Sequence, residues 1–126
     1  MIDHELAATQ LRVATAQFAD AHVVSVNGDL DLHTAPRLET ELDALREDGA
    51  RKVIVDLVDV PFIDSTALGV LVRAAKRSRS DHGKLILVSN DPRTLRVLEI
   101  TGLSRVFVVE RSLADAVGAV LDVGNV

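Results

Sequence analysis

The hydrophobic pattern is clearest in the middle of the chain, where an apolar run leads into a helical repeat. Residues 53–57 are mainly β-branched without regular polar alternation, which is typical of a central parallel strand covered on both faces. Asp64 and Ser65 follow a short loop, and apolar residues then recur at Leu68, Leu71, Val72 and Ala75. Side chains that accept hydrogen bonds are preferred where a helix begins. The pattern therefore predicts a buried strand, a loop, and a helix from Ser65 to residue 79 or 80.

Two strands and one helix are predicted before this central unit. Residues 11–15 alternate in polarity, which indicates a half-exposed edge strand, and residues 22–27 form a second strand. Their link is too short for a crossover helix, so we expect them to be antiparallel. Thr34 is expected to cap a helix that ends at Gly49. Its apolar stripe is Ala35, Leu38, Leu42 and Leu45, and the acids expected to turn outward are Glu39, Glu41, Asp43 and Glu47.

The second half of the chain continues the alternation of strands and helices. Residues 81–83 break the central helix, and residues 85–88 form a buried strand. The basic residues of that helix are expected to form a solvated side: Arg73, Lys76, Arg77 and Arg79. Asp91-Pro92 begins a helix that ends at Gly102. Residues 106–109 are the last predicted strand. Ser112 and Asp115 have the spacing of a capping box and begin a final helix that reaches Leu121.

This order of elements predicts an α/β fold. Each strand-helix-strand unit is expected to be a right-handed parallel crossover. The expected architecture is a small, mostly parallel sheet of about five strands, with the first strand antiparallel at the edge and about four helices as cover. The sequence shows no linker or internal repeat, so residues 1–126 are expected to form one domain.

Composition and charge narrow the possible functions. The chain has no Cys, which removes disulfides and thiol chemistry and is compatible with a reducing cytoplasm. Its net charge of -5 disfavours nucleic acid as a partner, and its low aromatic content leaves no base-stacking surface. No apolar run approaches membrane-spanning length, and the N-terminus is acidic rather than signal-like. We therefore expect a soluble, cytoplasmic protein without membrane insertion.

Polar side chains gather at one predicted edge of the sheet. Asp29, Asp31, Asp64 and Ser65 all lie at or just after the carboxyl ends of predicted strands, where open α/β sheets place their sites. Ser65 is expected at a helix N-terminus, where unsatisfied N–H groups and the helix dipole favour negative charge. A phosphoserine could be tolerated at this position. Helix capping and turn formation are the simpler interpretation of the same residues.

Other kinds of chemistry are less well supported. Ser65 lacks the Gly-x-Ser-x-Gly context of a hydrolase nucleophile, and no glycine-rich phosphate loop occurs, so we expect neither an enzyme nor a bound cofactor. The acids do not form a dense oxygen-ligand loop, so no metal site is predicted. A response-regulator receiver, with Asp56 or Asp59 as phosphoacceptor, is the main rival fold. It lacks an acidic pair after the first strand and a Lys after the last.

The segment Asp64-Ser65-Thr66-Ala67-Leu68-Gly69-Val70-Leu71, preceded by Val55-Asp56-Leu57 and Phe62, resembles the signature of STAS domains, specifically bacterial anti-sigma factor antagonists. Further matches are Gly28-Asp29-Leu30-Asp31, Thr34-Ala35, Gly83, Leu85, Leu87 and Thr101-Gly102-Leu103 with Phe107. The resemblance covers residues from about 8 to 123, the expected core of a single STAS domain. Ala67 departs from the Gly that the family often has there, and this change bears on partner choice.

The resemblance implies a partner-switching protein and assigns roles to the residues of this segment. Ser65 corresponds to the phosphoacceptor, and the implied partner-binding residues are Asp29, Asp31, Asp64, Thr66, Ala67 and Leu68. The unphosphorylated protein would bind an anti-sigma factor that is also a serine kinase and so free a sigma factor. A serine phosphatase would reverse the modification. The alternative is a STAS subunit of a transporter or sensory complex that acts without phosphorylation.

Overall fold

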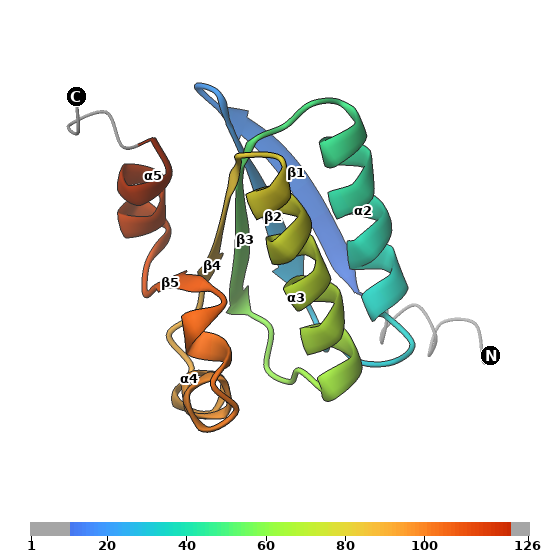
Figure 1. The fold of residues 1–126 in the computed structure, drawn as a ribbon. Coiled ribbons are helices and arrows are strands. Elements are labelled where there is room, and N and C mark those ends of the chain that lie inside the picture. Colours follow the sequence, from blue (N-terminus) through green and yellow to red (C-terminus); the bar gives the residue numbers. More distant parts are fainter. Residues whose placement is uncertain (1–10, 122–126) are drawn as a thin grey trace.

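The computed structural model describes residues 11–121, which form a five-stranded sheet in the order β1-β2-β3-β4-β5 (Figure 1). The strands are β1 (Arg12–Phe18), β2 (Ala21–Asn27), β3 (Lys52–Asp59), β4 (Lys84–Val88) and β5 (Val108–Glu110). β1 is antiparallel to β2, and all other neighbours are parallel. The predicted mixed sheet with an antiparallel edge is therefore confirmed.

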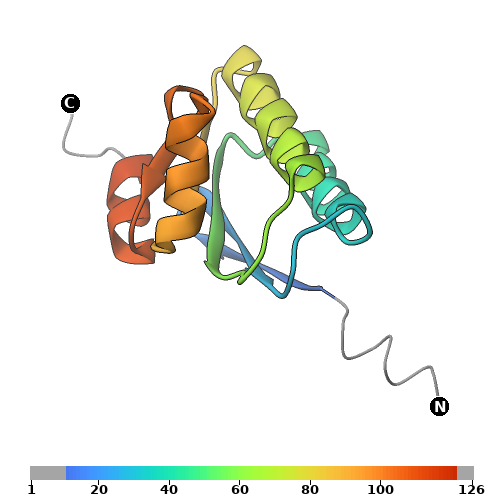
Figure 2. The same ribbon diagram turned by 90° about the horizontal axis from the view of Figure 1, so that it is seen from below.

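Helices cover both faces of this sheet. They are α2 (Ala35–Glu47), α3 (Ser65–Ser80), α4 (Pro92–Ile100), the short 3-10 helix η1 (Leu103–Arg105) and α5 (Leu113–Leu121). α2 and α3 lie side by side on one face, and α5 lies on the other (Figures 1 and 2). The four predicted α-helices are all present in the described part of the chain.

The hydrophobic core is divided by the sheet into two clusters. Val53, Val55 and Leu57 of β3 face α2 and α3 and join the larger cluster. Ile54 of the same strand packs on the other face, where α5 contributes Ala116 and Val120. Both faces of β3 are covered, which explains why its sequence lacks the polar alternation of a half-exposed strand.

The last strand differs from its prediction. Residues 106–109 were expected to be extended, but β5 is Val108–Glu110 and follows the η1 turn. Gly102 has a φ of 78°, a left-handed conformation that suits glycine after a helix end. The chain then turns tightly, and the N–H of Phe107 donates to the carbonyl of Leu103 at 3.1 Å. Phe107 is thereby buried in the larger cluster rather than placed in a strand.

Ion pairs join α2 to α3, and they add to the expected solvated basic side of α3, of which Arg73, Lys76 and Arg79 are exposed. Arg73 pairs with Glu39 at 3.3 Å and Arg77 pairs with Asp43 at 2.9 Å. Arg46 and Asp81 form the third pair at 2.7 Å. The partners recur at helical spacing on both helices, so the pairs follow one seam. Sequence periodicity showed that these side chains leave the core, but it did not show that they meet each other.

Candidate functional site

Two loops at the carboxyl end of the sheet are joined by backbone hydrogen bonds, and they build the candidate site. The N–H of Leu30 donates to the carbonyl of Phe62 at 2.9 Å, and the N–H of Asp64 donates to the carbonyl of Leu30 at 3.0 Å. A single parallel bridge between Leu30 and Ile63 continues this contact. The loop that precedes α2 therefore runs beside the start of α3 (Figure 2). These contacts bring the loop that carries Asp31 beside Asp64, at the edge of the sheet where both residues were predicted to lie.

Asp64 holds this arrangement together because each of its carboxylate oxygens accepts a backbone hydrogen bond. Oδ1 accepts from the N–H of Ala67 at 2.9 Å, which caps α3. Oδ2 accepts from the N–H of Leu32 at 2.9 Å, across 32 positions of sequence. The half-buried Asp64 is thus both a helix cap and a tie between the two loops.

Ser65 is the first residue of α3 and is exposed to solvent. The cap is supplied by Asp64, and among residues 11–121 no hydrogen bond is found for the Ser65 hydroxyl. The following residue, Thr66, is exposed as well. The hydroxyl of Ser65 therefore lies free at the positive end of a helix of 16 residues.

Ala67 and Leu68 correct the predicted partner-binding surface. Ala67 is 0% exposed and Leu68 is 9% exposed, and both belong to the larger core cluster. Their side chains are turned inward because the apolar stripe of α3 faces the sheet. The methyl group of Ala67 therefore contributes to packing and is not exposed beside Ser65.

Asp31 organises the loop that leads into α2. Its Oδ1 accepts from the N–H groups of His33 at 2.9 Å and Thr34 at 3.1 Å. Partial desolvation raises the pKa of Asp31, but the hydrogen bonds from Thr34 and His33 outweigh it and leave that pKa below its ordinary value. Asp31 is therefore ionised near neutral pH.

Thr34 occupies the N-cap position of α2, but its side chain does not cap the helix as predicted. Its hydroxyl donates instead to the carbonyl of Asp29 at 2.7 Å, and it accepts from the N–H of Asp31 at 2.9 Å. These local bonds close the turn before α2. Asp29 itself is exposed, and its carboxylate forms no hydrogen bond or ion pair within residues 11–121.

Two exposed apolar side chains belong to the same loops. Leu32 is 61% exposed and Phe62 is 53% exposed. Leu32 is adjacent in sequence to Asp31 and is bonded through its backbone to Asp64, and Phe62 lies three positions before Ser65. Neither residue was a predicted site residue. In the sequence, Leu32 is the second of two Leu residues in a short polar turn. Leu30 is buried in the core with 0% exposure, and Leu32 is left at the surface.

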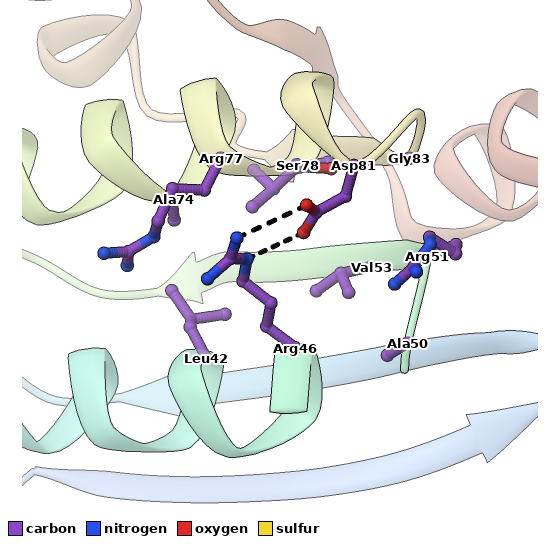
Figure 3. A pocket seen from close by; sticks show the side chains of 11 residues that line it. Leu42, Arg46, Ala50, Arg51, Val53, Ala74, Arg77, Ser78, Asp81 and Gly83 are labelled. Atoms are coloured by element: carbon purple, nitrogen blue, oxygen red, sulfur yellow. Dashed lines mark hydrogen bonds and ion pairs between the residues drawn. The ribbon is translucent and has the colours of Figure 1, made fainter. Parts of the chain in front are cut away.

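The candidate site is a surface rather than a cavity. The cavity in Figure 3, of about 30 Å³, lies near the C-terminal ends of α2 and α3, at the opposite end of α3 from Ser65. It is bordered by the Arg46–Asp81 pair, and Ser65 does not line it. In residues 11–121 no group of three His, Cys, Asp or Glu side chains is placed to hold a metal ion. An exposed surface of hydroxyl, carboxylate and apolar groups suits recognition by another protein.

Comparison with known proteins identifies the family. The sequence model of the STAS domain matches residues 12–116. The chain belongs to the STAS domain family. The anti-sigma-B factor antagonist of Staphylococcus aureus is 37% identical over 93 residues, which are 74% of this chain and 86% of the relative. Anti-sigma factor antagonists of this family are regulatory binding proteins and not enzymes.

Solved structures agree with this assignment. An anti-sigma factor antagonist from Mycobacterium paratuberculosis superimposes with a TM-score of 0.83 and 31% identity, covering 90% of this chain and 97% of the other. The Bacillus cell fate determinant SpoIIAA in its phosphorylated form has the same fold, with a TM-score of 0.69, 19% identity, and coverage of 86% and 99%.

The receiver alternative is set aside by the family assignment. Of its two candidate phosphoacceptors, Asp59 is exposed, and Asp56 is half-buried with its carboxylate accepting a hydrogen bond from the N–H of Val58 at 3.0 Å. This bond lies where the register between β2 and β3 shifts, between the Ser25–Asp56 and Asn27–Asp59 pairs. No helix within the described residues is long and apolar enough to cross a membrane.

Proposed function

We propose that this STAS domain is an anti-sigma factor antagonist that switches partners when Ser65 is phosphorylated. Unphosphorylated, it binds a cytoplasmic anti-sigma factor and thereby frees a sigma factor. That anti-sigma factor is a serine kinase, and its phosphorylation of Ser65 ends the complex. The observation that carries the proposal is the free, exposed hydroxyl of Ser65 at the N-terminus of α3. The names of the relatives support the antagonist role.

The surface around Ser65 offers contacts of two kinds to such a partner. Leu32 and Phe62 provide apolar area that a partner can bury. Asp29 provides a carboxylate that the loop structure does not use, so it is available for a cationic group. Asp31 and Asp64 act mainly by positioning, because their oxygens hold backbone N–H groups. Thr66 borders the acceptor, whereas Ala67 and Leu68 keep α3 fixed from inside.

The phosphoryl group would come from ATP held by the partner, since this chain has no glycine-rich phosphate loop. Ser65 Oγ forms the new bond to the γ-phosphorus, the bond to the β–γ bridging oxygen breaks, and ADP leaves. The hydroxyl proton passes to a base of the kinase or to water. A serine phosphatase hydrolyses the phosphoserine and restores the binding form.

Phosphorylation would act on binding more than on the fold. A phosphoserine adds about 1.5 to 2 negative charges at neutral pH. At the N-terminus of α3 the helix dipole stabilises that charge, and the cap supplied by Asp64 does not involve the Ser65 hydroxyl. In a complex, however, the phosphate would lose its hydrating water beside the apolar Leu32 and Phe62, and it would be repelled by the carboxylates of Asp29 and Asp64. Both effects weaken binding to the partner.

The test is phosphorylation by purified anti-sigma factor kinases with ATP, followed by mass spectrometry of the modified residue. Wild type and Thr66→Ala should gain one phosphate, and Ser65→Ala should gain none while still binding the kinase. Ser65→Asp and Ser65→Glu should bind at least tenfold more weakly, with a melting temperature near that of wild type. Phosphate found on Thr66 instead of Ser65 would refute the acceptor assignment.

An unchanged dissociation constant for Ser65→Glu would refute the switch. That result would favour the alternative role as a STAS subunit of a transporter or sensory complex that works without phosphorylation. A large loss of stability in Ser65→Glu would contradict the exposed position of Ser65. Circular dichroism of each variant separates these outcomes.

A further inference from the structure

The two edges of the sheet differ in length and in exposure. β5 forms one edge and has three residues. β1 forms the other edge and has seven residues, six of which are exposed. Among residues 11–121, β1 pairs with β2 on one side and with no strand on the other. A seven-residue backbone edge is therefore available for hydrogen bonding.

Apart from the charge of Arg12 at its start, β1 lacks the features by which edge strands avoid pairing. Natural edge strands carry Lys or Pro, contain a bulge, or are very short. The sequence of β1, RVATAQF, contains neither Lys nor Pro. Its seven residues pair with β2 in unbroken register, from Arg12 opposite Asn27 to Phe18 opposite Ala21. The edge is regular along its whole length, as required for adding a further strand.

We propose that β1 is a self-association surface on which a second copy of this chain pairs its own β1 in antiparallel orientation. The two sheets would become one continuous sheet of ten strands. A two-fold axis perpendicular to the sheet places α2 and α3 of both copies on the same face of that continuous sheet. This inference is independent of Ser65, which lies on α3 rather than on β1.

Side-chain complementarity selects the occupant and the register. Only the register centred on Thr15 pairs all seven residues of β1 with those of a second copy. In it Thr15 faces Thr15, Ala14 faces Ala16, and Val13 faces Gln17. Arg12, the one charged residue of β1, faces Phe18 of the other copy and no like charge. Phe18 is 55% exposed, so its ring is free to receive the guanidinium.

The test is sedimentation velocity of the full chain across a wide range of concentrations. We expect a concentration-dependent monomer–dimer equilibrium, because an interface limited to one strand is small and such contacts are weak. Hydrogen exchange should show β1 amides that are more protected in concentrated than in dilute samples. A monomer at all concentrations, with unchanged exchange of β1, would overturn the proposal.

Charge complementation at the symmetric position makes the test specific. Thr15→Lys and Thr15→Glu each place like charges directly opposite each other, so each variant alone should dimerise about tenfold more weakly than wild type. An equimolar mixture of the two should dimerise at least as well as wild type, because Lys then faces Glu. Circular dichroism checks that both variants keep the fold.

Val108→Lys is the matched control at the other edge, since Val108 is 54% exposed on β5. It should leave the equilibrium unchanged. If Val108→Lys abolishes dimerisation while the Thr15 variants do not, the association uses β5 and the proposal is wrong. If the mixture of Thr15 variants remains monomeric where wild type dimerises, the antiparallel register centred on Thr15 is wrong.

Discussion

Asp64 offers the sharpest test of how the site is built, because one side chain both caps α3 and ties the two loops together. Asp64→Ala removes both interactions. Loss of an N-cap costs about 1 kcal/mol of unfolding free energy. Loss of the hydrogen bond from the N–H of Leu32 adds about 1 to 2 kcal/mol. This is at the low end of the contribution of hydrogen bonds to charged acceptors, because the exposed N–H can bind water once the carboxylate is gone. We expect a total loss of about 2 to 3 kcal/mol.

The expected loss can be expressed as a melting temperature. A chain of 126 residues has an unfolding entropy of about 0.26 kcal/mol/K near its midpoint. Asp64→Ala should therefore melt about 8 to 11 °C below wild type. Asp64→Asn keeps one acceptor oxygen but presents an amide NH2 to the other N–H donor, so its loss should be intermediate. Ser65→Ala removes no hydrogen bond found among residues 11–121, so its stability should lie within about 0.5 kcal/mol of wild type.

Urea and thermal unfolding followed by far-ultraviolet circular dichroism provide the measurement, since the chain has no Trp or Tyr to report by fluorescence. Hydrogen exchange at the Leu32 amide should speed up in Asp64→Ala and stay unchanged in Ser65→Ala. The reasoning would be refuted if Asp64→Ala were no less stable than Ser65→Ala, or if Ser65→Ala lost as much stability as Asp64→Ala.

Three further predictions concern the support of the fold. Gly83→Ala should lose about 1 to 3 kcal/mol of stability in a urea titration, because its Cβ would lie 2.5 Å from the carbonyl oxygen of Arg51. The control Gly118→Ala has no atom within 4 Å of its Cβ, so it should be neutral or slightly stabilising. Leu71→Ala should cost about 2 to 5 kcal/mol, since Leu71 is 0% exposed in the larger cluster; a calorimetric loss below 1 kcal/mol would contradict that packing. The hydrogen bond and charge of Arg46 lower the pKa of Asp81 from its ordinary 3.8, so the stability from this pair is complete above that value and is lost as the pH falls through the lower, folded pKa. Arg46→Gln should therefore show a shallower fall of melting temperature below about pH 4 than wild type, and parallel curves for the two proteins would contradict this linkage.

The sequence alone determined most of the secondary structure, because the relevant signals are local. The apolar run that became β3, the stripe of α3 and the glycine after α4 depend on periodicity and backbone freedom that neighbouring residues reveal. The same patterns predicted the parallel order and placed Asp29, Asp31, Asp64 and Ser65 at one edge of the sheet. The last strand was misplaced because tertiary packing of Phe107 overrode an apolar, strand-like run.

The tertiary structure alone decided what each side chain at that edge does. Asp64 and Ser65 are both suitable capping residues by type, and Thr34 is as well. For Asp64 the outcome depends on a distant segment, because the amide of Leu32 reaches it across 32 positions of sequence. For Thr34 it depends on the turn before α2, where the hydroxyl donates to the carbonyl of Asp29. Within residues 11–121 the Ser65 hydroxyl has no hydrogen-bond partner, and Ala67 is buried, because α3 packs on the sheet at one particular rotation. The bond between Asp64 and Leu32 and the orientation of α3 are fixed by contacts between segments far apart in the chain, so neither follows from the local sequence.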